Sequence, residues 1–329
     1  MTGVQTCALP ISANDTKNAD NVLSIVIPCY RSEKTIGKLV RMTREVLLGL
    51  GYEPEFVLVN DCSPDGTFAE IVKLRDELPH IVGVDFAKNF GQHAAILAGM
   101  RHVSGSLVMI MDDDMQTHPS QCETLLNALT PDLDVVFGEY EHRKQAWWRR
   151  LGSEFNVWTK RVLAHYPKDI VPSNFMVMRR YVADAIAAYG APYPLTLGLI
   201  FRATSKVGNV SVKHFDREVG KSGYTFKSLV KLWSNVINFS LVPLRVATIT
   251  GVIMGGVGLL FALYILIRKL LNPAIQMGWS SLMVTILVCS GLTILFLGIV
   301  GEYVGRVFMT INDVPQFVIR NTVRSEDPR

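Results

Sequence analysis

Three consecutive carboxylates, Asp112, Asp113 and Asp114, directly follow the apolar run Leu107–Met111. Such groups repel one another unless a cation lies among them. At the end of a strand, the first and the third side chain point to one side. Carboxylate oxygens suit Mg²⁺ or Mn²⁺, ions that often bridge protein carboxylates to substrate phosphates. The pattern therefore predicts a divalent-metal site for a phosphate-bearing substrate; a water-exposed acidic loop is the alternative.

Short apolar runs alternate with helical patterns along residues 21–140, and one of these runs ends in the polar pair Asn60-Asp61. Runs rich in Val and Ile predict strands buried on both faces. Strands alternating with helices predict a mostly parallel, doubly wound α/β sheet, in which ligands bind beyond the carboxyl ends of the strands. We expect strands at Leu23–Pro28, Glu55–Asn60, Ile81–Phe86, Leu107–Met111 and Asp134–Phe137, and helices near Glu33–Leu50, Thr67–Leu78, Gly91–His102 and Ser120–Ala128.

The composition excludes several other classes of protein. Of 329 residues, 49% are hydrophobic and 19% charged, which predicts that part of the chain is buried in lipid. A net charge of +4 is too small to indicate a nucleic-acid-binding protein. The five Cys have neither metal-site nor disulfide-framework spacing. Gly220-Lys221-Ser222 lacks the earlier glycine of a phosphate-binding loop, and no G-x-G-x-x-G follows the first strand.

The apolar excess lies in the last third of the chain. No charged residue interrupts Val246–Ile267 or Leu270–Gly301, and the second stretch is densest from Trp279 onward. Stretches of this length predict two transmembrane helices, joined here by a tight turn at Asn272-Pro273. A pair of buried core helices is the alternative, although such helices seldom run this long without a charge.

The residues around the spans indicate their orientation and the division of the chain. Residues 226–244 predict an amphipathic helix in the headgroup plane, or alternatively a surface helix packed on the soluble domain. Residues 1–20 contain neither a signal peptide nor a span, so we expect an extension that is disordered or an error in the gene start. The expected parts are therefore 1–20, a catalytic domain at 21–225, the amphipathic helix at 226–244, a membrane hairpin at 245–301 and a cytoplasmic tail at 302–329. Flanking basic residues favour a cytoplasmic location for the catalytic domain and both termini: Lys227, Lys231 and Arg245 precede the spans, Arg306, Arg320 and Arg324 follow them, and Arg268 and Lys269 lie between them.

Six short motifs follow one another along the chain. They are Ile27-Pro28-Cys29-Tyr30, Asn60-Asp61-Cys62-Ser63-Pro64-Asp65-Gly66-Thr67, Lys88-Asn89-Phe90-Gly91-Gln92-His93, Asp112-Asp113-Asp114-Met115-Gln116, Arg217-Glu218-Val219-Gly220-Lys221-Ser222-Gly223-Tyr224 and Gly301-Glu302-Tyr303-Val304-Gly305-Arg306. With these motifs in this order, the chain resembles the family 2 glycosyltransferases of GT-A (Rossmann-like) fold from Leu23 to Arg320. Within that family it is similar to the polyprenyl-phosphate glycosyltransferases, the group that includes undecaprenyl-phosphate aminoarabinose transferases, bactoprenol glucosyltransferases and dolichol-phosphate mannose synthases.

The resemblance implies a role for individual residues. Asp61 would contact the nucleotide base, and an Mg²⁺ or Mn²⁺ ion would hold the donor diphosphate. For Arg149 the alternative is a solvated or headgroup-facing helix surface. The implied sets are donor binding by Pro28, Tyr30, Asp61, Lys88 and Asp112, metal ligation by Asp112, Asp114 and Gln116, phosphate binding by Arg143, Arg149, Ser153 and Arg217, and catalysis by Asp114, Arg217 and Ser222.

The chain departs from the family pattern at four places. The family often has Asp-Asp where this chain has Asn60-Asp61, and an asparagine where this chain has Arg31; both changes bear on the base contacts. Gly223 occupies a place where relatives commonly carry a lysine. Many relatives have an aspartate within the segment that here is Ser173-Asn174-Phe175, so no general base is assigned to Asn174.

The implied activity is inverting transfer of a sugar, with a UDP-hexose donor favoured, to undecaprenyl phosphate at the cytoplasmic face of a bacterial inner membrane. The acceptor phosphate is ionised near neutral pH, so the reaction needs charge stabilisation on the departing nucleoside diphosphate more than it needs a base. The expected partners are the nucleotide sugar, the polyprenyl phosphate and the bilayer, without nucleic acid; a homo-oligomer stays open. Two alternatives are an inactive membrane scaffold or lipid-flipping protein, and a processive polysaccharide synthase, whose Q-x-x-R-W signature is not matched by Gln145–Arg149.

Overall fold

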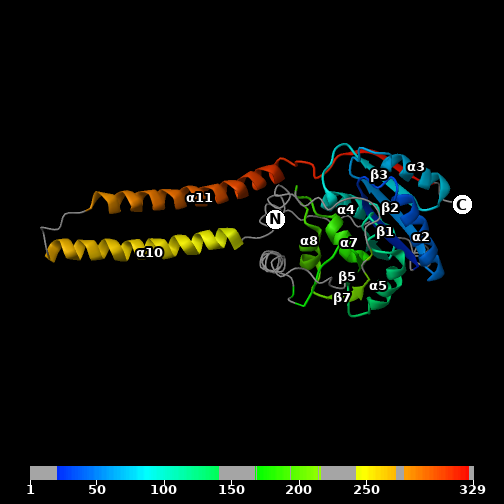
Figure 1. Cartoon of the computed structure of the whole chain (residues 1–329), viewed down its shortest axis with the longest axis horizontal. Coiled ribbons are helices and arrows are strands. Elements are labelled where there is room, and N and C mark those ends of the chain that lie inside the picture. Colours follow the sequence, from blue (N-terminus) through cyan, green and yellow to red (C-terminus); the bar gives the residue numbers. More distant parts are fainter. Residues whose placement is uncertain are drawn as a thin grey trace, which may run out of the picture. The chain divides into compact units, whose positions relative to one another are not determined.

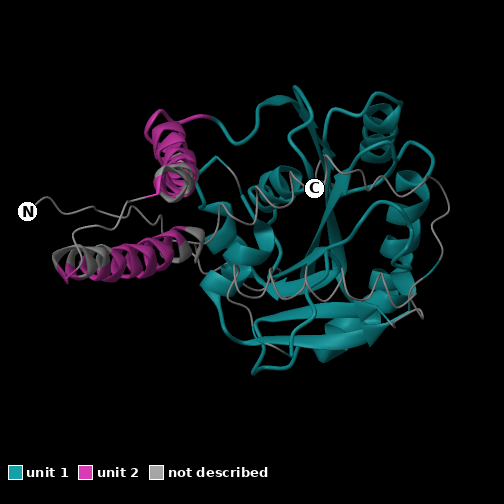
Figure 2. Ribbon diagram, turned by 60° about the vertical axis from the view of Figure 1, so that its left-hand side comes forward, with its two compact units in different colours: residues 1–154, 166–223, 315–329 teal, residues 155–165, 224–314 magenta. Residues whose placement is uncertain are grey.

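The computed structural model describes residues 21–140, 167, 169–192, 194–213, 215, 242–271 and 278–325 (Figure 1). The chain divides into two compact units (Figure 2). The first, here called the sheet unit, comprises residues 1–154, 166–223 and 315–329. The second, here called the hairpin unit, comprises residues 155–165 and 224–314. The last residues of the chain therefore belong to the same unit as the first strand.

The sheet unit is built on an eight-stranded sheet of order β7-β5-β6-β4-β1-β2-β3-β8 among its described residues. Its centre is parallel, because β1 pairs in parallel with β2 and β4, and β2 pairs in parallel with β3. The expected strands and the mostly parallel α/β fold are confirmed. The strands are β1 Val22–Cys29, β2 Glu53–Asn60, β3 Ile81–Phe86, β4 Leu107–Ile110, β5 Val135–Tyr140, β6 Met176–Arg179, β7 Val207–Val212 and β8 Ile319–Arg324.

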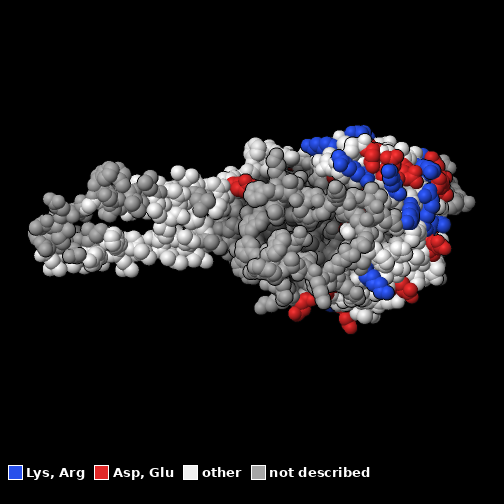
Figure 3. All heavy atoms as spheres, in the orientation of Figure 1, with Lys and Arg blue, Asp and Glu red and all other residues white. Residues whose placement is uncertain are grey.

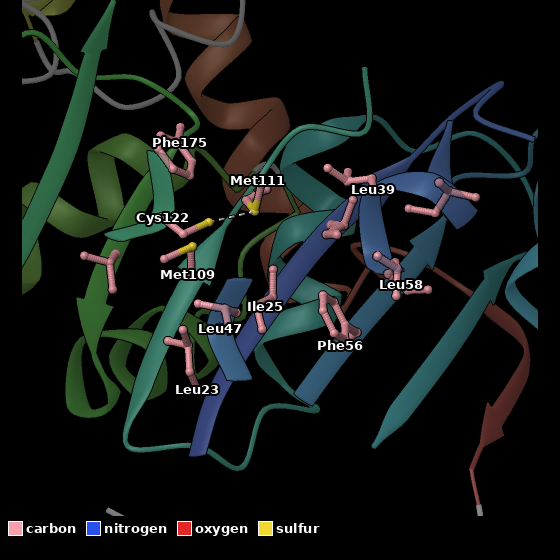
Figure 4. Packing of buried hydrophobic residues seen from close by; sticks show 14 of the residues in the cluster. Leu23, Ile25, Leu39, Leu47, Phe56, Leu58, Met109, Met111, Cys122 and Phe175 are labelled. Atoms are coloured by element: carbon pink, nitrogen blue, oxygen red, sulfur yellow. Dashed lines mark hydrogen bonds between the residues drawn. The ribbon is translucent and has the colours of Figure 1, made fainter. Parts of the chain in front are cut away.

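Helices cover both faces of the sheet, as a doubly wound fold requires. One face carries α2 Ile36–Gly49, α3 Thr67–Glu77 and, after the short helix η1 Pro119–Gln121, α5 Cys122–Ala128. The other face carries α4 Gln92–Met100, α7 Arg180–Ala187 and α8 Thr196–Ala203. The four helices expected from the sequence all form, whereas α7 and α8 and the strands β6 and β7 were not expected. The hydrophobic core under α2, α3 and α5 is formed by alternate residues of the central strands (Figure 4), among them Leu23, Ile25, Phe56, Leu58 and Met109.

The strand β8 joins the sheet from the far end of the chain. It runs antiparallel to β3, with Val323 opposite Gly83 and Thr322 opposite Val84. No helix or strand was expected in the tail 302–329, whereas α11 continues to Ile311 and β8 follows it. Because β3 would otherwise be an edge strand with unpaired main-chain groups, β8 covers that edge.

The hairpin unit contains two long helices, α10 Val242–Leu271 and α11 Trp279–Ile311, which contact each other. Within the described residues, one segment, Val288–Ile311, is long and apolar enough to cross a membrane, with a mean hydropathy of 1.7. In α10 a shorter apolar helical segment, Ala247–Gly258, lies within the described residues. The expected pair of helices therefore exists, one span is supported, and the second stays a prediction. The expected turn at Asn272-Pro273 and the extension 1–20 lie outside the described residues. Of the amphipathic helix expected at 226–244, residues 226–241 also lie outside them, and residues 242–244 belong to α10.

A close main-chain approach at Gly105 generates a prediction about stability. A Cβ atom at Gly105 would lie 2.9 Å from the amide nitrogen of Ser24 and closer still to the carbonyl oxygen of Val22. Backbone atoms cannot move aside cheaply, so Gly105→Ala should lower the free energy of unfolding by about 1 to 3 kcal/mol. Thermal unfolding of the purified protein in detergent measures this as a lower Tm.

Gly49→Ala is the matched control, because nothing lies within 4 Å of a Cβ atom at that exposed helical position. Alanine has the higher helix propensity, so this variant should keep or slightly raise Tm. Equal losses in the two variants would contradict the packing argument.

Candidate active site

The carboxyl ends of four neighbouring strands form one edge of the sheet. Between β1 and β4 the strand order reverses, which is where open α/β sheets bind ligands. Pro28 lies buried in β1 at this place, two residues after Val26, whose carbonyl oxygen accepts the N–H of Met111. Successive residues of a strand direct their main-chain groups to opposite neighbouring strands, so an N–H at position 28 would point toward β4. Proline has no N–H, and this causes no loss here because the pairing of β1 with β4 has already ended. This edge, here called the acidic edge, carries the polar residues that follow β1 to β4.

Asp61 follows β2 and is 4% exposed. Its Oδ1 accepts the N–H of Phe90 at 2.7 Å, and its Oδ2 accepts the N–H of Gly91 at 2.8 Å. The Asn89 side chain donates to the Asp61 carbonyl oxygen at 3.2 Å. Gly91 has φ +93°, a conformation that side-chain-bearing residues rarely adopt, and it precedes α4. The expected base-binding residue therefore holds the loop before α4 through both carboxylate oxygens.

Asp112 is tied to the first residue of α4. The Gln92 Nε2 donates to its Oδ1 at 2.7 Å, and Asn174 forms a second side-chain hydrogen bond with it. Removal of the carboxyl group from water, together with repulsion from Asp114 and Asp113, raises the pKa of Asp112 to about 7. A cation beside this group would relieve that repulsion.

The two following carboxylates have different partners. Asp113 accepts the Tyr30 N–H at 2.9 Å, which joins the loop after β1 to the loop after β4. Burial raises the pKa of Asp113, and the Tyr30 N–H opposes that shift. Asp114 Oδ1 accepts the Gln116 N–H at 3.0 Å, across Met115 with φ +61°. The middle carboxylate thus has a structural contact to the loop after β1, whereas Asp112 and Asp114 remain the pair expected to face a ligand.

The structure also brings together residues that the sequence analysis did not assign to the site. Gln92 and Asn174 contact Asp112, and Tyr140 donates to or accepts from Thr117 at 2.6 Å. The pKa of Tyr140 is raised to about 12, mainly by burial and also by the carboxylates of Asp112 and Asp114. Gln92 lies in one of the six motifs, and the family pattern already marks the segment around Asn174, but no sequence signal connects Tyr140 with this edge.

The donor set at this edge fits a divalent cation that a substrate helps to bind. No group of three His, Cys, Asp or Glu side chains converges on a metal position within the described ranges. Two carboxylates are nevertheless enough for Mg²⁺ when substrate phosphates and water supply the other oxygens. The raised pKa of Asp112 is the sign of a charge that such an ion would offset. Metal ligation by Asp112, Asp114 and Gln116 stays a prediction.

The remaining expected site residues divide into two groups. Tyr30 is 44% exposed at the end of β1, with the Arg31 guanidinium 5.5 Å from its ring centre, and Lys88 lies 4.9 Å from the centre of the Phe90 ring. Both belong to loops of the acidic edge. The expected phosphate-binding and catalytic residues Arg143, Arg149, Ser153, Arg217 and Ser222 lie outside the described residues.

The chain matches the model of a known protein family and is similar to two curated proteins over most of its length. The model of the family "Glycosyl transferase family 2" matches residues 24–186. The chain is 30% identical, over 93% of its length and 95% of the relative's, to undecaprenyl-phosphate 4-deoxy-4-formamido-L-arabinose transferase of Edwardsiella ictaluri (strain 93-146). It is 28% identical, again over 93% and 95%, to the uncharacterized glycosyltransferase YkcC of Bacillus subtilis (strain 168).

Among solved structures, the chain is similar to glucosyl-3-phosphoglycerate synthase from Mycobacterium tuberculosis in complex with phosphoglyceric acid. The TM-score is 0.49 at 16% sequence identity, with 68% of this chain and 81% of that chain covered.

Because the pKa of Asp112 is raised, we expect the charged form of this carboxyl group to destabilise the folded state of the metal-free protein. The ordinary pKa of an aspartate is near 3.8, and the environment in the folded protein raises the pKa of Asp112 to about 7. Between these values the folded state holds a proton that the unfolded state has released, so the stability linked to Asp112 falls as the pH rises toward 7. Asp112→Asn should therefore raise the free energy of unfolding at pH 8 in EDTA by about 2 to 4 kcal/mol.

Thermal unfolding at several pH values measures this effect. The gain in Tm should shrink as the pH falls toward 4, because wild-type Asp112 is then neutral in both states. The control Asp132→Asn alters an exposed carboxylate and should show little difference between pH 5 and pH 8. A gain at Asp112 that does not change with pH would contradict the assigned cause.

Proposed function

The chain belongs to glycosyl transferase family 2 and is a glycosyltransferase, and we propose that it transfers a sugar from a nucleotide sugar to a polyprenyl phosphate at a membrane surface. The observation that carries this proposal is the combination, in one chain, of the acidic edge with long helices whose apolar side chains are exposed. The relative from Edwardsiella ictaluri, whose name states undecaprenyl phosphate, aligns with 93% of this chain, so the similarity is not confined to the sheet unit. We favour a UDP-hexose as the donor.

The apolar surface of the hairpin unit supports a lipid environment. Side chains on both helices are well exposed, including Val252 at 70%, Leu260 at 67%, Ile294 at 71% and Leu297 at 65%. In Figure 3 the described atoms of this unit are nearly all white, whereas blue and red gather on the sheet unit. An apolar surface of this extent is unusual in a soluble monomer and favours contact with lipid. A polyprenyl phosphate keeps its tail in the same environment.

The proposed donor site is the acidic edge. Asp112, Asp114 and Gln116 would hold Mg²⁺ or Mn²⁺ there, and when bound this ion stabilises the negative charge on the departing nucleoside diphosphate. Pro28, Tyr30, Asp61 and Lys88 would bind the nucleotide part, with Asp61 also holding the Phe90 and Gly91 amides in place.

One residue proposed for the phosphates, Arg217, follows closely in the sequence on a described residue that contacts this edge. Phe215 donates its N–H to the Gln116 carbonyl oxygen at 3.0 Å, and its ring lies 5.2 Å from that of His118. Arg217 follows two residues later in the sequence, which supports its proposed role beside the donor phosphates. Ser222 would complete the phosphate cradle with Arg143, Arg149 and Ser153.

The proposed reaction is a single in-line displacement with inversion at the anomeric carbon. The acceptor phosphate oxygen is already ionised near neutral pH, so it attacks without a general base. Asn174 contacts Asp112 and lies in a segment where many relatives have an aspartate. Its side chain is a neutral amide and cannot serve as a general base. Catalysis then rests on stabilising the leaving group and on aligning two phosphate-bearing substrates that repel each other.

The proposed location is a bacterial inner membrane, with the sheet unit and both termini in the cytoplasm. Two spans return the chain to its original side. The position of β8 in the sheet agrees with this, because residues before and after the hairpin must then lie on one side of the membrane.

The direct test supplies a panel of UDP and GDP sugars to membranes that contain the protein. Mass spectrometry should detect a new polyprenyl phosphate sugar for one donor. Asp114→Asn should abolish this product, because the variant loses a proposed metal ligand and a charge at the acidic edge. Excess EDTA should do the same, and Mn²⁺ or Mg²⁺ should restore the product.

The control for this assay is Asp132→Asn, which should keep wild-type turnover. Undiminished transfer in EDTA or by Asp114→Asn would exclude the proposed metal role. Absence of a lipid product with every donor, while the nucleotide sugar is still consumed with a soluble acceptor, would exclude the polyprenyl phosphate.

Substitution in the hairpin tests the lipid contact of each helix separately. A charged residue in place of leucine at the centre of a span costs about 3 to 4 kcal/mol. Leu297→Asp in α11 and Leu260→Asp in α10 should each reduce the fraction of protein that remains in carbonate-washed membranes. Leu297→Ala and Leu260→Ala should stay in the membrane like the wild type. Retention of Leu260→Asp together with loss of Leu297→Asp would mean that α10 does not span.

A further inference from the structure

The strand β8 places a guanidinium against two loops of the acidic edge. The Arg320 Nη2 donates to the carbonyl oxygen of Ala87 at 3.0 Å and lies 4.0 Å from the Cys62 sulfur. Its Nη1 lies 3.5 Å from Asp85 Oδ2. Cys62 directly follows Asp61, and Ala87 directly precedes Lys88. One side chain from the end of the sequence therefore contacts both segments that carry the proposed nucleotide-binding residues.

Asp85 extends this contact across the sheet. It is 5% exposed, and its Oδ1 accepts the Asn60 Nδ2 at 2.7 Å. The Asn60 Oδ1 in turn accepts the Ser63 N–H at 3.2 Å. The Ser63 hydroxyl accepts the Arg31 N–H at 3.0 Å, at a residue with φ +59°. The polar connection thus runs from β8 through the ends of β3 and β2 to the loop after β1.

A second, mainly apolar connection starts just before β8. The Phe317 ring stacks on Phe86 with 5.2 Å between ring centres, and Phe86 meets the edge of Phe90 at 5.6 Å. The Arg101 guanidinium lies 4.9 Å from the centre of the Phe317 ring, and its Nη2 donates to the Gln316 side chain at 2.7 Å. Phe90 is the residue whose N–H binds the Asp61 carboxylate. Both connections therefore end on the loops around Asp61.

We propose that the C-terminal strand β8 is a part of the nucleotide half of the active site, in which Arg320 is a positioning residue for the loops that carry Asp61 and Lys88. The proposal rests on the proposed function, because it takes a nucleoside diphosphate as the ligand of this edge. Arg320 acts through the Asp85 carboxylate and the Ala87 carbonyl group and touches no reacting atom. Its planar fork can bond two acceptors at once, which a lysine ammonium on a flexible stem cannot reproduce in the same geometry.

Asn60 has a defined place in this arrangement. Its amide donates to Asp85 and accepts from Ser63, so an aspartate at this position would place two carboxylates within 3 Å of each other, with one guanidinium to balance them. Asn60 and Arg320 thus both contact the Asp85 carboxylate. A second variant, Asn60→Asp, therefore alters this connection without a change in side-chain size.

The experiment uses the full-length protein in detergent with UDP or GDP and Mn²⁺ as probes. Calorimetry gives the Kd of the nucleoside diphosphate, and the donor assay gives KM and kcat. Arg320→Ala and Asn60→Asp should each raise the Kd and the donor KM at least fivefold, whereas kcat at saturating donor should stay within about twofold. Arg320→Lys should lie between Arg320→Ala and the wild type.

Arg324→Ala is the matched control on the same strand. Arg324 pairs with Val82 at the other end of β3 and contacts the His102 Nδ1 at 3.2 Å, away from the loops around Asp61. This variant should leave Kd and KM at wild-type values, even where it lowers Tm as much as Arg320→Ala does. Such a separation of KM from Tm is not expected of a residue that only stabilises the fold.

Two outcomes would overturn the proposal, and they are distinguishable. If the wild type binds UDP or GDP and both Arg320→Ala and Asn60→Asp bind it equally well, the positioning role is wrong and the proposed function stands. If the wild type binds neither nucleotide, the proposed function is wrong, and the positioning role is wrong with it.

Discussion

Both oxygens of the Asp61 carboxylate accept main-chain N–H groups, and the arrangement of the acidic edge depends on this interaction. Charge-assisted hydrogen bonds to a buried carboxylate are among the stronger ones in proteins. They hold the loop before α4 in the turn that Gly91 permits with its positive φ. The side chain of Gln92, the first residue of α4, then donates to Asp112, which follows β4. A single carboxylate at the end of β2 thereby sets the position of a group at the end of β4.

This edge concentrates negative charge that its own residues offset only in part. Asp61 faces amides at the start of α4, where the helix dipole favours an anion. Asp113 receives the Tyr30 amide, which opposes the effect of its burial. Asp112 receives two side-chain hydrogen bonds and still has a pKa raised to about 7. Sites that bind charged ligands commonly carry such a cost, because the ligand supplies the missing charge.

The connectivity of the chain joins the hairpin to the sheet. The helices α10 and α11 lie in the sequence between β7 and β8, and β8 pairs with β3. A chain that ended before the hairpin would therefore expose the edge of β3 and lose the contacts of Arg320 and Phe317. Loss of function in such a truncated protein would not show that lipid contact is required, because the sheet itself would be incomplete. Substitutions on the exposed helix faces separate the two effects.

The sequence by itself determined the parts of this protein that depend on neighbouring residues. Short runs of four to six mostly apolar residues predict β1 to β5, and acidic or polar groups directly after them predict the edge at which a ligand binds. Long uncharged stretches predict α10 and α11. These patterns are local, because burial on both faces of a strand and contact with lipid each leave a continuous apolar run.

Only the tertiary structure decided which distant residues contact one another at this edge. Asn174 contacts Asp112, and Arg320 contacts Asp85, although long stretches of chain separate the members of each pair. The family pattern relates position 60 to the base contacts, yet in the structure the Asn60 amide lies between Asp85 and Ser63 and binds both. The strand β8 has a polar sequence, Ile-Arg-Asn-Thr-Val-Arg, with no apolar run to mark it. The physical reason is that an edge strand is held by main-chain pairing, which leaves little trace in the side chains, and that contacts between distant residues are set by how the strands are ordered in the sheet.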